Sequence, residues 1–216
     1  MTRRLLVATR SAHKLREIRQ IMEEVGGPAV IDLSEAGVDY DPAEEEIEVH
    51  DSFEANAMAK ARYFARRSGM TTLADDSGLC VDALGGAPGV RSKRFSGRAD
   101  LEGDALDAAN NAFLLERLAD VPDDRRTAHY VCVAAVAEPD GRERVFAGRC
   151  DGEILREPRG NGGFGYDPLF YVPEEGATFG QIDAARKNQL SHRARAMRAV
   201  AEALRNRVAS PDRTDG

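Results

Sequence analysis

The stretch TTLADDSGLCVDALGGAPG, from Thr71 to Gly89, decides the predicted architecture. Residues 71–74 are β-prone and follow a helix stop, so they predict a short strand. The adjacent acids Asp75 and Asp76 come at the end of this strand, where α/β sheets usually bind ligands. Because successive strand residues point to opposite faces, at most one acid continues a buried face, and the other needs a cation, a helix N-terminus or solvent. Oxygen ligands of this kind favour Mg²⁺ over zinc.

Residues 75–78 also have the composition of a solvated turn, which is the alternative interpretation. The neighbouring sequence favours a ligand site instead, since the glycine-rich segment 85–89 and the basic segment 91–94 follow directly. Acids that can hold a metal, a flexible backbone and nearby cations together suit a polyphosphate ligand.

Size, charge and cysteine content restrict the class of protein. The 216 residues predict one domain of two lobes over residues 1–209, followed by a disordered polar tail, residues 210–216. The net charge of −7 disfavours a nucleic-acid groove, so any anion site is local. Three cysteines without C-x-x-C spacing indicate a reducing, cytoplasmic compartment. The apolar run at residues 5–8 is too short for a signal peptide or a membrane span.

The hydrophobic pattern predicts a mixed α/β fold, with a central sheet flanked by helices. A hairpin across residues 139–141 makes the sheet mixed rather than purely parallel. The predicted strands are residues 5–9, 30–33, 71–74, 128–137, 144–148 and 169–172. The predicted helices are residues 15–25, 53–68 and 104–118, and a last helix that begins after Ser191.

Three segments in the N-terminal third of the chain carry candidate phosphate and metal contacts. The loop from Thr9 to Lys14 joins a strand to a helix and can hold phosphate, although Ser11 alternatively only caps the helix. An acidic loop, residues 39–51, is mostly solvated, but one of its glutamates can complete a metal shell begun by Asp76. Lys60 shares a helix face with aromatic residues, which suits a helix beside a cleft unless Lys60 is simply exposed.

Two later segments carry candidate base contacts. The glycine-rich segment RGNGGFGYDP, residues 159–168, suggests an exposed aromatic residue, Phe164, on an adaptable loop. An aromatic face stacks on any nucleobase; alternatively Phe164 and Tyr166 fill the core. His192 and Arg193 follow the predicted cap Ser191, where cations oppose the helix dipole and so hint at a bound acceptor or anion.

Five separated motifs identify a resemblance: T-x-S-x-x-K at 9–14, F-x-x-N-A-x-x-K-A at 53–61, ADDSGL-x-V-D-x-L-GGAPG-V at 74–90, GGFGYDP at 162–168 and SHR at 191–193. With these motifs, nearly the whole chain resembles the inosine triphosphate pyrophosphatase family. The resemblance implies a two-lobed α/β fold with the site in the cleft, a homodimer and Mg²⁺ dependence. The implied reaction converts ITP, dITP or XTP and water to the monophosphate and pyrophosphate.

The resemblance also implies roles for individual residues. Asp76 matches the general base and a metal ligand, with Asp75 beside it, and Glu48 or the nearby Glu46 matches the second metal ligand. Residues that match triphosphate contacts are Lys14, Lys60 and Ser77, and the first-loop residues Thr9, Arg10 and Ser11 are further candidates for substrate binding. Residues that match the base pocket are Phe164, Gly165, Tyr166, Asp167, Lys187, His192 and Arg193. The family usually has Thr-Gly-Asn in the first loop, so Arg10 and Ser11 depart from its pattern.

Hydrogen-bond polarity predicts the base preference, because donors from Lys187, His192 or Arg193 would reward the 6-oxo group of hypoxanthine and xanthine. Sites built on such bonds discriminate by ~10⁴-fold. Three alternatives remain: a pyrimidine-nucleotide pyrophosphatase, which should lack GGFGYDP and SHR; a nucleotide sensor, which would tolerate loss of the carboxylates; and a nucleic-acid-binding module, which the net charge disfavours.

Overall fold

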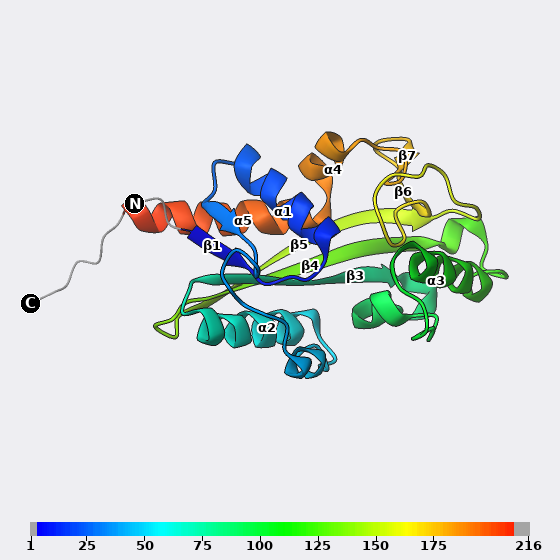
Figure 1. The fold of residues 1–216 in the computed structure, drawn as a ribbon. Helices are drawn as coiled ribbons and strands as arrows, with labels where there is room; N and C mark the ends of the chain where they lie inside the picture. Colours follow the sequence, from blue (N-terminus) through cyan, green and yellow to red (C-terminus); the bar gives the residue numbers. More distant parts are fainter. Residues whose placement is uncertain (1–3, 210–216) are drawn as a thin grey trace, which may run out of the picture. The chain divides into compact units, whose positions relative to one another are not determined.

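A computed structural model describes residues 4–209 of the chain (Figure 1). The described strands are β1 Arg4–Val7, β2 Ala29–Ile31, β3 Thr72–Val81, β4 Thr127–Ala137, β5 Glu143–Ile154, β6 Phe170–Val172 and β7 Ala177–Thr178. The α-helices are α1 Ala12–Glu24, α2 Phe53–Ser68, α3 Gly103–Arg117, α4 Ala184–Leu190 and α5 His192–Ala209. Short 3₁₀ helices are η1 Pro42–Glu46, η2 Asp82–Leu84, η3 Gly89–Arg94 and η4 Asp123–Arg125.

The described strands form one mixed sheet in the order β2-β1-β3-β4-β5-β6-β7. Strand β1 is parallel to both β2 and β3, whereas β5 with β6 and β6 with β7 are antiparallel. The register of β1 and β3 pairs Leu6 with Thr72 and Val7 with Leu73. The predicted mixed α/β class is therefore confirmed.

The chain forms two compact units, and β3, β4 and β5 each contribute residues to both. Unit 1 contains described residues 4–76, 133–147 and 193–209, and unit 2 contains residues 77–132 and 148–192. The single domain of two lobes stays a prediction, and the expected tail, residues 210–216, lies outside the described residues.

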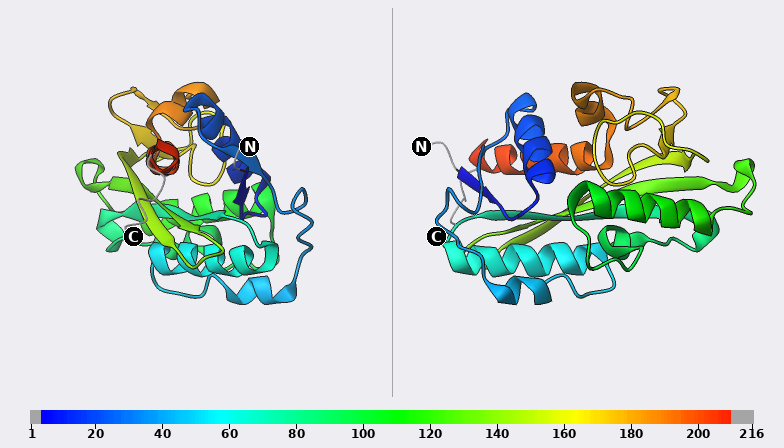
Figure 2. Two further views of the ribbon diagram at one scale, coloured as in Figure 1. Left: turned by 90° about the vertical axis from the view of Figure 1, so that its left-hand side faces the viewer. Right: turned by 45° about the vertical axis from the view of Figure 1, so that its right-hand side comes forward.

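Unit 1 is layered, with α2 on one face of β1 and β3 and with α1 and α5 on the other (Figures 1 and 2). Helix α2 has the predicted bounds because a capping residue stands at each of its ends. The Ser52 side chain accepts a hydrogen bond from Ala55 N, and Gly69 ends the helix with a left-handed φ of 66°. Alanines and Phe64 pack the inner face of α2, and Leu5, Leu6 and Val7 of β1 are fully buried.

Unit 2 has its own hydrophobic core, in which Tyr130, Phe170 and Phe179 make ring contacts. Leu114 and Leu118 bury the inward stripe of α3 against this core, as the amphipathic pattern predicts. Among the described residues of both units, every helix is too short or too polar to cross a membrane.

Candidate active site

Strand β3 carries the two central acids, and it does not end at them. The predicted strand end at the two acids is wrong, and so is the alternative turn over residues 75–78, because β3 continues through these residues to Val81. Asp75 and Asp76 are therefore interior strand residues with side chains on opposite faces, and both are buried. Each acid consequently depends on a different set of partners from the helices of unit 1.

Asp75 is held by cations from α1 and α5. Its Oδ2 lies 3.2 Å from Lys14 Nζ and accepts a hydrogen bond from Arg193 Nη2 at 3.3 Å. Burial alone would raise the pKa of Asp75, but the charges of Lys14, Arg193 and Lys60 outweigh it and hold the pKa well below its usual range. Asp75 is thus a permanently ionised carboxylate that fixes two cations.

The surroundings of Asp76 shift its pKa in the opposite direction from that of Asp75. Its Oδ2 accepts a hydrogen bond of 2.9 Å from Asn56 Nδ2 on α2. Burial raises the pKa of Asp76, the negative charge of Glu48 adds to this effect, and the lowering effect of Lys14 and Lys60 does not cancel it. Two adjacent carboxyls whose pKa values are pushed apart in this way are suited to different tasks.

Lys60 joins the acidic loop to β3. Its Nζ donates to the backbone oxygen of Asp75 at 2.7 Å and to the carboxylate of Glu48. Burial would lower the pKa of Lys60, but Glu48 and Asp75 raise it above its usual value, so the ammonium stays charged. The Glu48 carboxyl is stabilised in turn: burial opposes its ionisation, yet Lys60 brings its pKa below the ordinary value.

Glu48 is the glutamate of the acidic loop whose charge acts on Asp76. Glu46, which the sequence allowed to exchange roles with it, is an exposed residue at the end of η1. The exposed-lysine alternative for Lys60 is wrong, since only 12% of its side chain is accessible.

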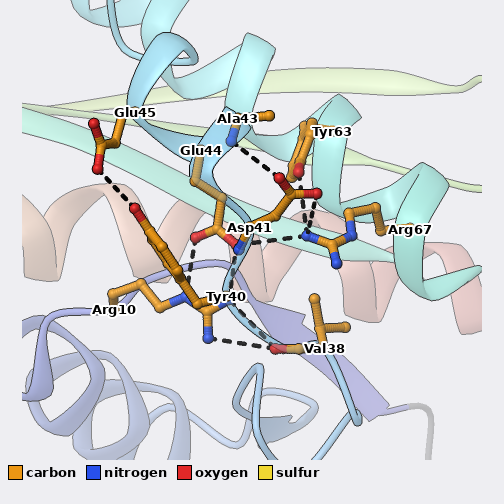
Figure 3. A network of polar contacts seen from close by, with 9 residues as sticks. All are labelled: Arg10, Val38, Tyr40, Asp41, Ala43, Glu44, Glu45, Tyr63 and Arg67. Carbon is orange, nitrogen blue, oxygen red and sulfur yellow. Dashed lines mark hydrogen bonds and ion pairs between the residues drawn. The ribbon is translucent and has the colours of Figure 1, made fainter.

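Arg10 is turned toward the acidic loop (Figure 3). Its Nε and Nη2 donate to the two carboxylate oxygens of Glu44 at 3.0 and 2.8 Å, and Nη1 and Nη2 donate to Val38 O at 3.3 Å. Arg67 of α2 lies 3.6 Å from Glu44 and 3.5 Å from Asp41 (Figure 3). The Arg10 guanidinium therefore binds the acidic loop, and its phosphate contact stays a prediction.

The remaining first-loop residues form a helix start. The Ser11 side chain accepts from Lys14 N and caps α1, as the alternative interpretation stated. The Thr9 hydroxyl accepts from Ser11 N at 3.2 Å. Both hydroxyls thus have local structural roles, and their phosphate contacts stay predictions.

The glycine-rich segment in unit 2 makes hydrogen bonds that involve buried charged side chains, and its adaptability stays a prediction. Asp167 Oδ2 accepts from Phe164 N at 2.9 Å and from Lys187 Nζ at 2.6 Å, and both charged side chains are buried. Lys187 Nζ also lies 5.0 Å from the centre of the Phe164 ring, within cation–π range. Phe164, Asp167 and Lys187, all predicted base-pocket residues, are therefore brought together.

Tyr166 and His192 are buried more deeply than Phe164, and both contact other buried side chains of unit 2. Tyr166 belongs to the hydrophobic core and its hydroxyl donates to Ser92 O at 2.7 Å, so the core-filling alternative is right for Tyr166 but not for the half-buried Phe164. The His192 ring stacks on Tyr130, with centroids 4.6 Å apart and an interplanar angle of 8°.

The predicted residues thus form two groups, one in each unit. The unit 1 group comprises Lys14, Glu48, Lys60, Asp75, Asp76 and Arg193. The unit 2 group comprises Phe164, Gly165, Tyr166, Asp167, Lys187 and His192, and Ser77 begins that unit. Arg193, predicted in the base pocket, binds the carboxylates of Glu17 and Asp75, and its base contact stays a prediction.

Three residues that support these groups were absent from the predicted site. Asn56 stands in a quoted motif and binds Asp76, and its amide also pairs with the backbone of His50. Asp107 and Asn111 of α3 bind the backbone of Gly165. Their only sequence signal is an acid and an amide four residues apart on a helix, which is too common to select them.

Comparison with known proteins finds a family model, named relatives and solved structures that are similar to the chain. The Ham1 family model matches residues 5–203. The chain is 48% identical to a dITP/XTP pyrophosphatase of Nocardia farcinica, with 98% of each chain covered. It is 42% identical to the solved nucleoside-triphosphatase / dITP/XTP pyrophosphatase of Mycobacterium abscessus, with a TM-score of 0.70 over 91% of this chain and 98% of that one. A HAM1 protein structure from Coxiella burnetii gives 35% identity and a TM-score of 0.80, with 94% and 99% covered.

Proposed function

Because the chain belongs to the Ham1 family, we propose that it hydrolyses deaminated purine nucleoside triphosphates, namely dITP, ITP and XTP or dXTP. The products are the nucleoside monophosphate and pyrophosphate, so the bond that breaks joins the α-phosphorus to the α–β bridging oxygen. Such a reaction clears mutagenic precursors from the nucleotide pool.

The observation that carries the mechanism is the difference between the partners of the two adjacent acids. Asp75 is bound by the cations Lys14 and Arg193, whereas Asp76 accepts a hydrogen bond from the neutral amide of Asn56. A general base is most effective when its pKa lies near the working pH, and burial moves Asp76 in that direction. Asp76 therefore takes the proton of the attacking water. Asp75 is a poor base, because its carboxylate is committed to Lys14 and Arg193.

The cations of unit 1 bind the triphosphate. Phosphoryl transfer needs charge neutralisation and alignment more than covalent chemistry. Lys14 and Lys60 are charged, are attached to different helices and are positioned by Asp75 and Glu48. They neutralise phosphate oxygens when the substrate is bound.

The carboxylates of Glu48 and Asp76 would hold Mg²⁺. No group of three or more His, Cys, Asp or Glu side chains within residues 4–209 is arranged to hold a metal. Mg²⁺ fits nevertheless, because it is usually bound by one or two carboxylates together with substrate phosphates. The raised pKa of Asp76 beside Glu48 also marks a place where added positive charge is favourable. When bound, Mg²⁺ supplies charge stabilisation to phosphate oxygens.

The unit 2 group selects the base. Phe164 supplies a ring face for stacking, and Lys187 supplies a buried ammonium that can donate to a 6-oxo group. Adenine presents an amino donor at the 6-position, so the buried ammonium of Lys187 would find no acceptor there. The proposal extends to a cytoplasmic homodimer, in keeping with the family resemblance.

The decisive experiment incubates the protein with Mg²⁺ and, separately, dITP, dATP, dGTP and dTTP, and identifies the phosphorus product. We expect pyrophosphate from dITP and much slower turnover of dATP, whose 6-amino group would face the Lys187 donor. Guanine shares the 6-oxo group of hypoxanthine, so this donor does not discriminate against dGTP. Orthophosphate release would reject the proposed bond cleavage, and equal rates on all four nucleotides would reject the base selection.

A further inference from the structure

Helix α3 binds both backbone polar groups of one residue in the glycine-rich loop, Gly165. Asp107 Oδ2 accepts a hydrogen bond from Gly165 N at 2.6 Å, and Asn111 Nδ2 donates to Gly165 O at 2.8 Å. Asp107 and Asn111 are four residues apart, so they lie one turn apart on the same face of α3. Two side chains of one rigid helix thus fix the position and the orientation of the Gly165 residue.

This contact is made at a residue whose backbone conformation only glycine adopts readily. Gly163 and Gly165 have left-handed φ values of 73° and 64°, which glycine reaches without strain and which an open glycine-rich segment readily leaves. The residues on either side of Gly165 make other hydrogen bonds. Phe164 N donates to the Asp167 side chain, and the Tyr166 hydroxyl donates to Ser92 O. The α3 side chains hold the backbone of Gly165 between these attachments, directly after Phe164 in the chain.

A stacking ring contributes to affinity only if it is already in position, because ordering a loop during binding subtracts from the free energy gained. Phe164 is half-buried and lies over Lys187, so its ring is presented rather than folded into the core. We propose that Asp107 and Asn111 are positioning residues for base recognition, which act by holding the Gly165 peptide and with it the Phe164 ring. This inference rests on the proposed function, since the base is the ligand that the ring would meet.

Near-isosteric exchanges test the hydrogen-bond polarity directly. Asp107→Asn keeps an oxygen that can accept from Gly165 N, whereas Asn111→Asp replaces the donor to Gly165 O with a carboxylate that repels it. We expect Asp107→Asn to keep the wild-type KM for dITP within about twofold, and Asp107→Ala, Asn111→Ala and Asn111→Asp to raise it roughly tenfold. The kcat should change little, because the ring does not touch the reacting phosphorus. Glu116→Ala, which removes an exposed acid from the same helix, is the matched control.

A base-free ligand separates base positioning from general damage. Inorganic tripolyphosphate binds through phosphate contacts alone, so its inhibition constant should stay at the wild-type value in the variants whose dITP KM rises. Equal weakening of dITP and tripolyphosphate in all of them would overturn the positioning role, as would wild-type KM values in Asn111→Asp and Asp107→Ala.

A spectroscopic measurement decides the inference independently of turnover. The chain has no tryptophan, so Phe164→Trp creates a single reporter in the loop. In this background, Asn111→Asp and Asp107→Ala should increase acrylamide quenching of the free protein, whereas Asp107→Asn and Glu116→Ala should not. Unchanged quenching in the first two would reject the loop attachment. If the protein failed to hydrolyse dITP but the quenching pattern held, the proposed function would fail while the attachment stood.

Discussion

Arg10 donates two hydrogen bonds to Glu44, so that the loop before α1 is tied to the acidic loop (Figure 3). The Arg10 side chain is 39% exposed and that of Glu44 only 9%, so one partner is close to solvent and the other is covered. A two-nitrogen contact of this geometry is more specific than a single ion pair. It directs the guanidinium toward Glu44 and leaves Lys14 as the cation of this segment that contacts Asp75.

We expect Arg10→Ala to lower the free energy of unfolding by about 0.5–1 kcal/mol, because the lost pair is partly exposed and Arg67 remains near Glu44. The KM for dITP should change by less than about twofold, since this guanidinium already has protein acceptors. Urea unfolding and steady-state kinetics measure the two effects, with Arg16→Ala, an exposed arginine of α1, as the control. A tenfold rise in KM would instead establish the phosphate contact that the sequence indicated.

Asp75→Asn should be strongly destabilising, by roughly 3–5 kcal/mol, because it leaves the buried charges of its partners without their carboxylate. The pH dependence has a definite sign. The pKa of Asp75 is lowered in the folded state, so its contribution is present above its ordinary value near 4 and is lost as pH falls below it. Denaturant unfolding between pH 2 and pH 7 should show that the free energy of unfolding falls at acid pH in the wild type. The fall should be smaller in Asp75→Asn. Identical slopes would contradict the assignment.

Asp76→Asn should have the opposite effect on stability. The pKa of Asp76 is raised by burial, so ionisation costs folding free energy as pH rises from the ordinary aspartate value through the raised one. In metal-free buffer at pH 7 the Asn variant should therefore be at least as stable as the wild type, with the difference vanishing at low pH. Its kcat should fall by about 10²–10⁴-fold, as for loss of a general base. Wild-type turnover would remove Asp76 from the mechanism.

Lys187→Gln should lower both stability and selectivity. The buried Asp167 carboxylate would lose its ammonium partner, at a cost of roughly 3–5 kcal/mol. The ratio of kcat/KM for dITP over dATP should fall toward one, because the donor proposed for the 6-oxo group is weakened. Lys187→Gln combined with Asp167→Asn should recover stability without recovering selectivity. A double variant that recovers both would show that the pair is structural.

Sequence reasoning succeeded where local chemistry determines the structure. Helix α2 was predicted with its observed bounds, because Ser52 and Gly69 mark its two ends. It failed at residues 75–78, whose composition indicates a turn, because the cations that stabilise the buried acids come from distant helices. Helix α4 was missed since seven residues are too few to display an amphipathic period.

The candidate site was predictable to a similar extent. Lys14, Lys60, Asp75 and Asp76 were identified by residue type and motif, and they do lie together in unit 1. The partners of Arg10 could not be predicted, because Glu44 is one of several neighbouring glutamates and only the folded loop selects it. Asp107 is separated from Gly165 by 58 residues, and no local pattern connects them.

Since β3 presents Asp75 and Asp76 to opposite faces, the length of this strand matters as much as its side chains. Removing a single residue after the Leu6–Thr72 pairing would turn every following side chain to the other face. If the lost residue precedes Asp75, Asp76 would take the place of Asp75 among the cations of α1 and α5. Asp75 would move to the place of Ala74, and Ser77 would take the place beside Asn56. Conservative replacements can be absorbed at many positions of such a strand, whereas one deleted codon would leave the Asn56 amide facing a hydroxyl in place of a carboxyl.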